Sequence, residues 1–125
     1  MPTLTLTTDA FEATISSGIT LVDFWADWCG PCRMFAPIYE AASEKNPDIT
    51  FGKVDTEAEQ ALASAAGITS IPTLMAFCDG ILVFSQPGAL PAPALDQVIE
   101  AVKGLDMHEV HKKLAEQDAA TQQDT

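Results

Sequence analysis

The segment Trp28-Cys29-Gly30-Pro31-Cys32 holds two cysteines that are separated only by a glycine and a proline. An apolar run, Leu21-Val22-Asp23-Phe24-Trp25-Ala26, precedes it, and Arg33-Met34-Phe35-Ala36 begins a helical pattern directly after it. A Cys-x-x-Cys segment at the junction of a strand and a helix is typical of a thiol–disulfide redox site. This stretch therefore predicts both a local fold and a chemistry.

Length and composition indicate one globular domain. The chain has 125 residues, of which 47% are hydrophobic and 19% are charged. A domain of this length can bury enough surface to fold without a disulfide or a metal. The net charge of −12 argues against nucleic acids and anionic membranes as partners, because both repel an acidic surface.

The cysteine count and the first residues bear on the compartment. Three cysteines cannot form a complete set of disulfides. The start Met1-Pro2-Thr3-Leu4 lacks the basic and apolar parts of an export signal, and the apolar runs are too short to span a bilayer. We therefore expect a cytoplasmic protein, in which a cysteine pair is more often catalytic than structural.

Hydrophobic periodicity predicts an α/β fold. Asp9 and Glu12 are expected to cap the first helix, and Gly18 to end it. Asp79-Gly80 between two apolar runs is a strong hairpin signal. The expected strands cover residues 3–7, 20–26, 49–54, 73–78 and 81–85, and the later helices cover about 32–45, 57–66 and 92–103. Helical crossovers and a final hairpin imply a central mixed β-sheet of about five strands, flanked by four α-helices.

The C-terminal part extends beyond this pattern. Asp106 and Glu109 form a second capping box, which predicts a short extra helix from residue 107 to about residue 117. Residues 118–125 are small and polar, so we expect them to be disordered. The predicted division is a folded domain over residues 1–105 and an extension over residues 106–125.

Four blocks, in this order, carry a resemblance to the thioredoxin family, in particular its small bacterial type. They are residues 22–32, Lys53-Val54-Asp55, residues 67–74 and Gly88-Ala89-Leu90. The resemblance spans about residues 3–105 and implies the thioredoxin fold. It also implies a disulfide reductase that is recharged by an NADPH-dependent thioredoxin reductase and that acts on disulfide-containing client proteins. The chain lacks a Gly-x-Gly-x-x-Gly fingerprint, so we expect it to bind no nucleotide or other cofactor.

Cys29 is the expected nucleophile and Cys32 the resolving thiol. A thiolate attacks disulfides, and the start of the helix would favour ionisation of Cys29. The spacing suggests that Cys29 is exposed and that Cys32 points inward. No histidine lies between the two cysteines, which favours a reducing site over an oxidising one.

Asp23 lies within an apolar strand, where burial raises the pKa of a carboxyl group. By resemblance, Asp23 is the general base that deprotonates Cys32 through water, and Lys53 is its charge partner across the sheet. The alternative is a purely structural ion pair.

Pro72 resembles the cis-proline that faces the cysteine pair in this family, although a simple turn is the alternative. A cis bond would expose the Ile71 backbone to an extended substrate. Ser70, Pro87 and Pro91 depart from the family pattern and could reshape the partner surface. The expected substrate-binding residues are Trp28, Gly30, Pro31, Gly67, Ile71, Pro72, Gly88 and Ala89.

Several alternatives remain open. The cysteine pair could be half of a zinc site, with Cys78, His108 and His111 as the other candidate ligands, but we expect no metal. Cys78 is expected to be partly exposed, as an incidental residue or as a regulatory thiol. The chain could instead be a thioredoxin-like binding module or assembly subunit with little turnover, or a disulfide isomerase or oxidase. We expect a monomer.

Overall fold

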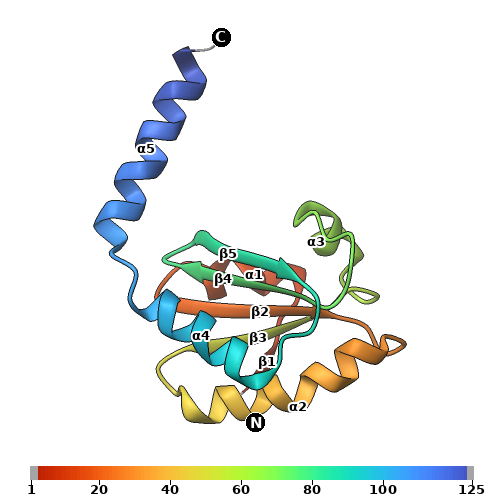
Figure 1. The fold of residues 1–125 in the computed structure, drawn as a ribbon. Coiled ribbons are helices and arrows are strands. Elements are labelled where there is room, and N and C mark those ends of the chain that lie inside the picture. The colour runs from red at the N-terminus through yellow and green to blue at the C-terminus, as the bar shows by residue number, and fades with distance from the viewer. Residues whose placement is uncertain (1–2, 124–125) are drawn as a thin grey trace.

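The computed structural model describes residues 3–123. The predicted order of strands and helices is confirmed, and most bounds lie within two residues of those expected. In chain order (Figure 1), the elements are β1 Thr3–Thr5, α1 Thr8–Ile15, β2 Ile19–Trp25, α2 Gly30–Lys45, β3 Thr50–Asp55, α3 Gln60–Ala65, β4 Thr73–Cys78, β5 Ile81–Pro87, α4 Ala92–Lys103 and α5 Met107–Gln123.

The strands form one mixed sheet in the order β1-β3-β2-β4-β5. The central strand β2 pairs parallel with β3 and antiparallel with β4. Strand β5 completes the antiparallel hairpin with β4 at the edge of the sheet. Asp23 in β2 lies opposite Lys53 in β3 and Leu74 in β4, so the buried centre of the sheet holds one acidic residue.

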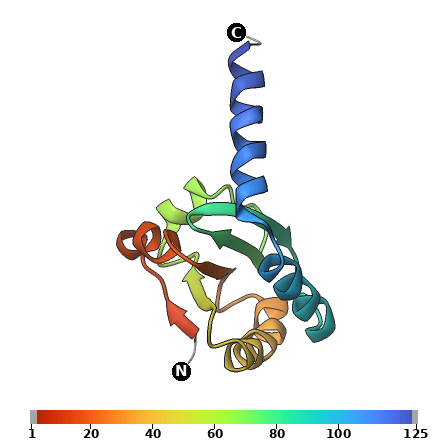
Figure 2. The ribbon, with the colours of Figure 1, turned by 90° about the vertical axis from the view of Figure 1, so that its left-hand side faces the viewer.

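Helices cover both faces of this sheet (Figure 2). Helices α2 and α4 pack on one face around a core that includes Phe35, Tyr39 and Leu95. Helices α1 and α3 cover the other face around a second core that includes Phe11 and Leu62. The near-continuous apolar sequence of β2 follows from this arrangement, because a strand covered on both faces buries side chains on each of them.

The predicted cap of α1 is wrong. The helix begins at Thr8, before Asp9, and Thr7 makes no side-chain capping bond. The Thr8 amide instead donates to the Glu59 carboxylate over 2.8 Å. Because Glu59 is 51 residues away in the chain, no local pattern could have indicated this cap.

Helix α3 begins three residues later than expected and ends within one residue of the expected position. Asp55 holds the preceding segment in a turn, in which its carboxylate accepts the Glu57 amide over 2.9 Å. Gly67 (φ 73°) follows the last turn. The Gly67 amide donates to the Ser64 carbonyl, and the Ile68 amide donates to the Ala63 carbonyl. This Schellman arrangement needs the left-handed conformation that glycine adopts readily.

The hairpin prediction is confirmed, since Asp79 (φ 50°) and Gly80 (φ 83°) form the turn between β4 and β5. Asp106 caps α5 through its carboxylate, which accepts the amides of His108 and Glu109. Helix α5 continues to Gln123, beyond the expected end near residue 117, and Asp124 and Thr125 lie outside the described residues. The expected disorder from residue 118 stays a prediction. The helix projects away from the domain (Figure 1). None of the described helices is long and apolar enough to cross a membrane.

Candidate active site

The end of β2 and the start of α2 place the two cysteines together. Cys29 is the N-cap residue of α2, and Pro31 lies in the first turn, where its missing amide hydrogen costs nothing. Cys29 and Cys32 form a disulfide, with their Cα atoms 5.2 Å apart. The Cys32 amide donates to Cys29 Sγ over 3.2 Å. The first turn of α2 therefore directs an amide dipole at this sulfur, which favours a thiolate there after reduction.

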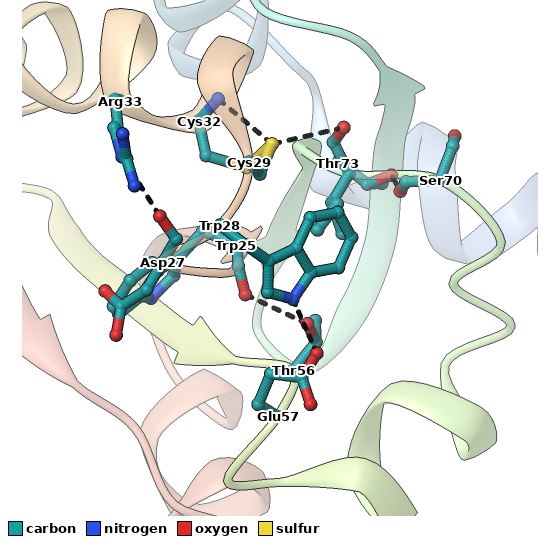
Figure 3. The surroundings of a disulfide bond; sticks show 11 residues. Trp25, Asp27, Trp28, Cys29, Cys32, Arg33, Thr56, Glu57, Ser70 and Thr73 are labelled. Carbon is teal, nitrogen blue, oxygen red and sulfur yellow. Dashed lines mark hydrogen bonds between the residues drawn. A yellow bond between two sulfur atoms is a disulfide. The ribbon is translucent and has the colours of Figure 1, made fainter.

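Both cysteines are buried, so the expected exposure of Cys29 is wrong: each is only 4% exposed. Ala26 packs against the pair, and Trp25 and Ile71 cover it further. Trp28, in contrast, is 66% exposed beside the disulfide, so the approach to the sulfur atoms runs past its indole ring (Figure 3).

The Ile71–Pro72 peptide bond is cis, as the resemblance implied. The Ile71 carbonyl oxygen lies 3.7 Å from Cys29 Sγ, and the Thr73 hydroxyl donates to the Ser70 carbonyl over 2.6 Å. The backbone before β4 therefore lies directly against the disulfide (Figure 3).

A second loop meets this one. The amide of Gly88, which follows β5 with φ 99°, donates to the Pro72 carbonyl over 2.7 Å. Exposed Ala89 comes next. The expected substrate-binding residues Ile71, Pro72 and Gly88 thus lie together, whereas Gly67 lies at the end of α3.

Asp23 is 1% exposed, and neither of its carboxylate oxygens has a hydrogen-bond partner among the described residues. Burial raises the pKa of this carboxyl group from 3.8 to about 7, and the charge of Lys53 offsets part of that rise. Position 23 therefore holds the expected buried carboxyl group with a raised pKa. A pKa near 7 lets the group both accept and release a proton under ordinary conditions.

Lys53 faces Asp23 in the sheet register, but the two side chains form no ion pair within 4.0 Å. The Lys53 ammonium nitrogen lies 4.9 Å from the centre of the Trp25 ring, in a cation–π contact. Across the part of the chain that the structure describes, the one ion pair within 4.0 Å joins Lys103 to Asp48. Lys53 therefore acts on Asp23 through its field, without direct contact.

A small cavity lies beside Cys32 and Lys53. Its volume is about 100 Å³, and it is lined by Trp25, Ala26, Asp27, Cys32, Arg33, Ala36 and Lys53. It reaches from the inner cysteine to the lysine that faces Asp23 in the sheet register. A space of this size can hold water.

Two contacts at the mouth of the site involve residues that sequence reasoning missed. The Trp28 indole nitrogen donates to the Glu57 carboxylate over 2.6 Å, and Arg33 Nε donates to the Asp27 carbonyl over 3.0 Å (Figure 3). Glu57 lies in the loop after β3, and no motif marks it. Only the sheet, which brings the ends of β2 and β3 together, places it beside Trp28.

Cys78 is 4% exposed, so its expected partial exposure is wrong. Neighbouring side chains on β4 are buried alike, because helices cover both faces of this strand. Burial, and then the negative charge of Asp79, raises the pKa of the Cys78 thiol. No group of three or more histidine, cysteine or acidic side chains converges as a metal site within the described residues.

Comparison with known proteins agrees with this geometry. The family model described as Thioredoxin matches residues 2–101. The chain is 55% identical to "Putative thioredoxin 2" of Streptomyces coelicolor over 94% of this chain and 88% of that protein. It is 39% identical to the thioredoxin of Bacillus subtilis over 74% of this chain and 90% of that protein.

Solved structures give the same result. A mutant thioredoxin from Halobacterium salinarum superposes with a TM-score of 0.77 at 37% identity, over 83% of this chain and 93% of that one. Plasmodium falciparum thioredoxin superposes with a TM-score of 0.73 at 36% identity, over 78% of this chain and 96% of that one. The chain therefore belongs to the thioredoxin family.

Proposed function

We propose that this chain, a thiol-disulfide oxidoreductase of the thioredoxin family, works as a reductant of protein disulfides through Cys29 and Cys32. The observation that carries the proposal is the disulfide at the start of α2, with the Cys32 amide directed at Cys29 Sγ. This amide and the helix dipole favour a thiolate at Cys29, which makes Cys29 the attacking group.

The reaction runs in two exchanges. The Cys29 thiolate attacks one sulfur of the client disulfide, forms a mixed disulfide and releases the other client sulfur as a thiolate. The Cys32 thiolate then attacks Cys29 Sγ and displaces the second client thiolate. The client gains two electrons, and the Cys29–Cys32 disulfide closes.

Asp23 is the proposed general base for the second exchange. Cys32 must lose its proton before it can attack, and a buried carboxylate with a pKa of about 7 is a suitable acceptor. The cavity beside Cys32 and Lys53 offers a path for the proton through water. The positive charge of Lys53 would stabilise the Asp23 carboxylate before this transfer.

An extended client segment would lie on the surface beside the disulfide. The exposed Trp28 ring and the backbone of Ile71 and Pro72 support this placement. A strand-like segment could pair with the Ile71 backbone and so reach the buried Cys29. The proposed surface includes Gly30, Pro31, Gly67, Gly88 and Ala89 as well.

Recycling of the disulfide requires two electrons from outside the chain. We propose that a thioredoxin reductase supplies them from NADPH and that the protein itself binds no cofactor. The proposed compartment is the cytoplasm, where the pool of reductant keeps such a pair reduced. Both thiols of the cycle belong to one chain, so one copy suffices for turnover.

Reduction of insulin tests the proposal. The protein with dithiothreitol, or with NADPH and a bacterial thioredoxin reductase, should precipitate the insulin B chain, and Cys29→Ser should abolish this activity. A thioredoxin-like binding module would give no turnover over the thiol background. An isomerase or oxidase would instead show a reduction potential well above the thioredoxin range in a glutathione buffer.

A further inference from the structure

The Lys53 side chain can direct its ammonium group to either of two residues of β2. Lys53 pairs with Asp23 in the register of β2 and β3, and its carbonyl accepts the Leu6 amide over 2.8 Å, so its backbone is fixed. Asp23 and Trp25 are two residues apart on β2, so their side chains lie on the same face of the sheet as that of Lys53. Rotation of the Lys53 side chain therefore decides which of the two its ammonium group meets.

The ammonium group meets the tryptophan. Its nitrogen lies 4.9 Å from the centre of the Trp25 ring, within the range of a cation–π contact. Among described residues 3–123, Lys53 forms no ion pair within 4.0 Å. Both oxygens of the Asp23 carboxylate also lack a hydrogen-bond partner in this part of the chain, although Asp23 is buried. The cation that faces this buried acid across the strands is therefore turned toward an aromatic ring.

Packing holds the Trp25 ring in place. The ring lies against the cluster of Ala26, Cys29 and Cys32. Its indole nitrogen is buried and has no hydrogen-bond partner within the described residues, so no hydrogen bond there sets its orientation. Trp25, Lys53 and Cys32 also line the same cavity of about 100 Å³. Contact with the ring therefore keeps the Lys53 side chain at the wall of the cavity that the resolving thiol also lines.

We propose that Trp25 is a positioning residue of the redox reaction, whose ring holds the Lys53 ammonium group beside the cavity and away from Asp23. This inference rests on the proposed function, in which Asp23 accepts the proton of Cys32. A close ion pair with Lys53 would favour the charged form of Asp23 and so weaken it as a proton acceptor. A cation held on the ring acts on the cavity through its field and leaves the Asp23 oxygens able to take up the proton.

The charged or titratable groups around Asp23 come from neighbouring elements and the cavity wall. They are Tyr39 and Cys32 of α2, Lys53 of β3, and the exposed residues Asp27 and Arg33 at the cavity; Leu74 of β4 is apolar. Burial, and then the charge of Asp23, raises the pKa of Tyr39 well above its usual value, and Cys32 does not titrate within the disulfide. Burial raises the pKa of Asp23 to about 7, and the charge of Lys53 offsets part of that rise. Movement of the Lys53 ammonium group should therefore appear directly in the titration of Asp23.

An NMR titration of the Asp23 carboxyl carbon in the oxidised protein tests the proposal. Trp25→Leu removes the ring, so the ammonium group should move onto Asp23 and lower the measured pKa of that carboxyl group by about one unit or more. Trp25→Phe is the matched control, because phenylalanine keeps a ring that binds a cation less strongly than tryptophan does, and the pKa should fall less. An unchanged or raised pKa in Trp25→Leu, or in Trp25→Phe if only that variant folds, would overturn the proposal.

Lys53→Met separates the effect of the charge from that of the packing. Methionine keeps an unbranched apolar chain without the charge, so in this background the same Trp25 substitution should leave the pKa of Asp23 unchanged. A fall that persists without the lysine would show that loss of the ring only lets water reach Asp23, and it would overturn the proposal.

The titration uses the oxidised protein without any client, so it is independent of the insulin assay. If insulin reduction fails while the pKa falls as expected, the contact between Trp25 and Lys53 stands and the reductase proposal does not. If the pKa does not fall while insulin is reduced, the reductase proposal stands and the positioning role of Trp25 is refuted.

Discussion

Replacement of Asp23 by asparagine should stabilise the protein, and the gain should grow with pH. Asp23 is 1% exposed, and burial raises its pKa from 3.8 to about 7. The native state therefore holds a proton that the unfolded chain releases at much lower pH. Wild-type stability falls as pH rises from about 4 to about 7, because ionisation of Asp23 is easier after unfolding.

The magnitude follows from linkage. One pKa unit corresponds to about 1.4 kcal/mol, so a change from 3.8 to about 7 corresponds to about 4 kcal/mol once the pH exceeds the native value. Part of this difference is already present at about pH 5. Between about pH 5 and about pH 8, the stability difference between variant and wild type should grow by roughly 2 to 3 kcal/mol.

Guanidinium unfolding of the oxidised proteins, followed by tryptophan fluorescence, measures this difference. The change with pH is the informative quantity, because the asparagine side chain contributes equally at each pH. Asp27→Asn is the matched control, since Asp27 is exposed and lies just after the same strand, and its effect should stay within about 0.5 kcal/mol. A stability difference for Asp23→Asn that does not change with pH would refute the reasoning.

Three further predictions test other parts of the structure. The buried Tyr39 hydroxyl donates to the Gly52 carbonyl over 2.8 Å, so Tyr39→Phe should lower the free energy of unfolding by about 1 to 2 kcal/mol in guanidinium; an unchanged value would contradict this hydrogen bond. Iodoacetamide should label Cys29 of the native reduced protein and leave Cys78 unmodified, because the Cys32 amide favours a thiolate at Cys29, whereas the raised pKa of Cys78 keeps that thiol protonated; rapid labelling of Cys78 would revive a regulatory role. Glu57→Ala releases the exposed Trp28 indole and should reduce kcat/KM for insulin by about two- to fivefold without a loss of stability, whereas an unchanged kcat/KM would show that this bond does not position Trp28.

Most of the fold could be predicted because its signals are local. The turn residues Asp79-Gly80 have the left-handed backbone that their sequence suggested. Parallel pairing followed from the helical crossovers. The cap of α1 could not be predicted, because Glu59 reaches it from a distant loop.

The sequence indicated the reactive groups of the site but not the residues that surround them. The strand pattern was enough to place Asp23 in the interior, but the position of the Lys53 ammonium depends on the Trp25 ring, which competes for it. Exposure of Cys29 and Cys78 depends on loops and helices far away in the chain. Such contacts arise only from packing, so spacing within a motif does not reveal them.

Mixed-disulfide trapping tests most directly whether Cys29 attacks and Cys32 resolves. Cys32→Ser and Cys29→Ser, each reduced and then mixed with a disulfide-bonded client such as insulin, are compared by non-reducing mass spectrometry. We expect Cys32→Ser to accumulate an adduct at Cys29, whose sulfur accepts the backbone amide of residue 32, and Cys29→Ser to give little adduct at Cys32. An adduct that accumulates mainly in Cys29→Ser would contradict the assigned order of the two thiols.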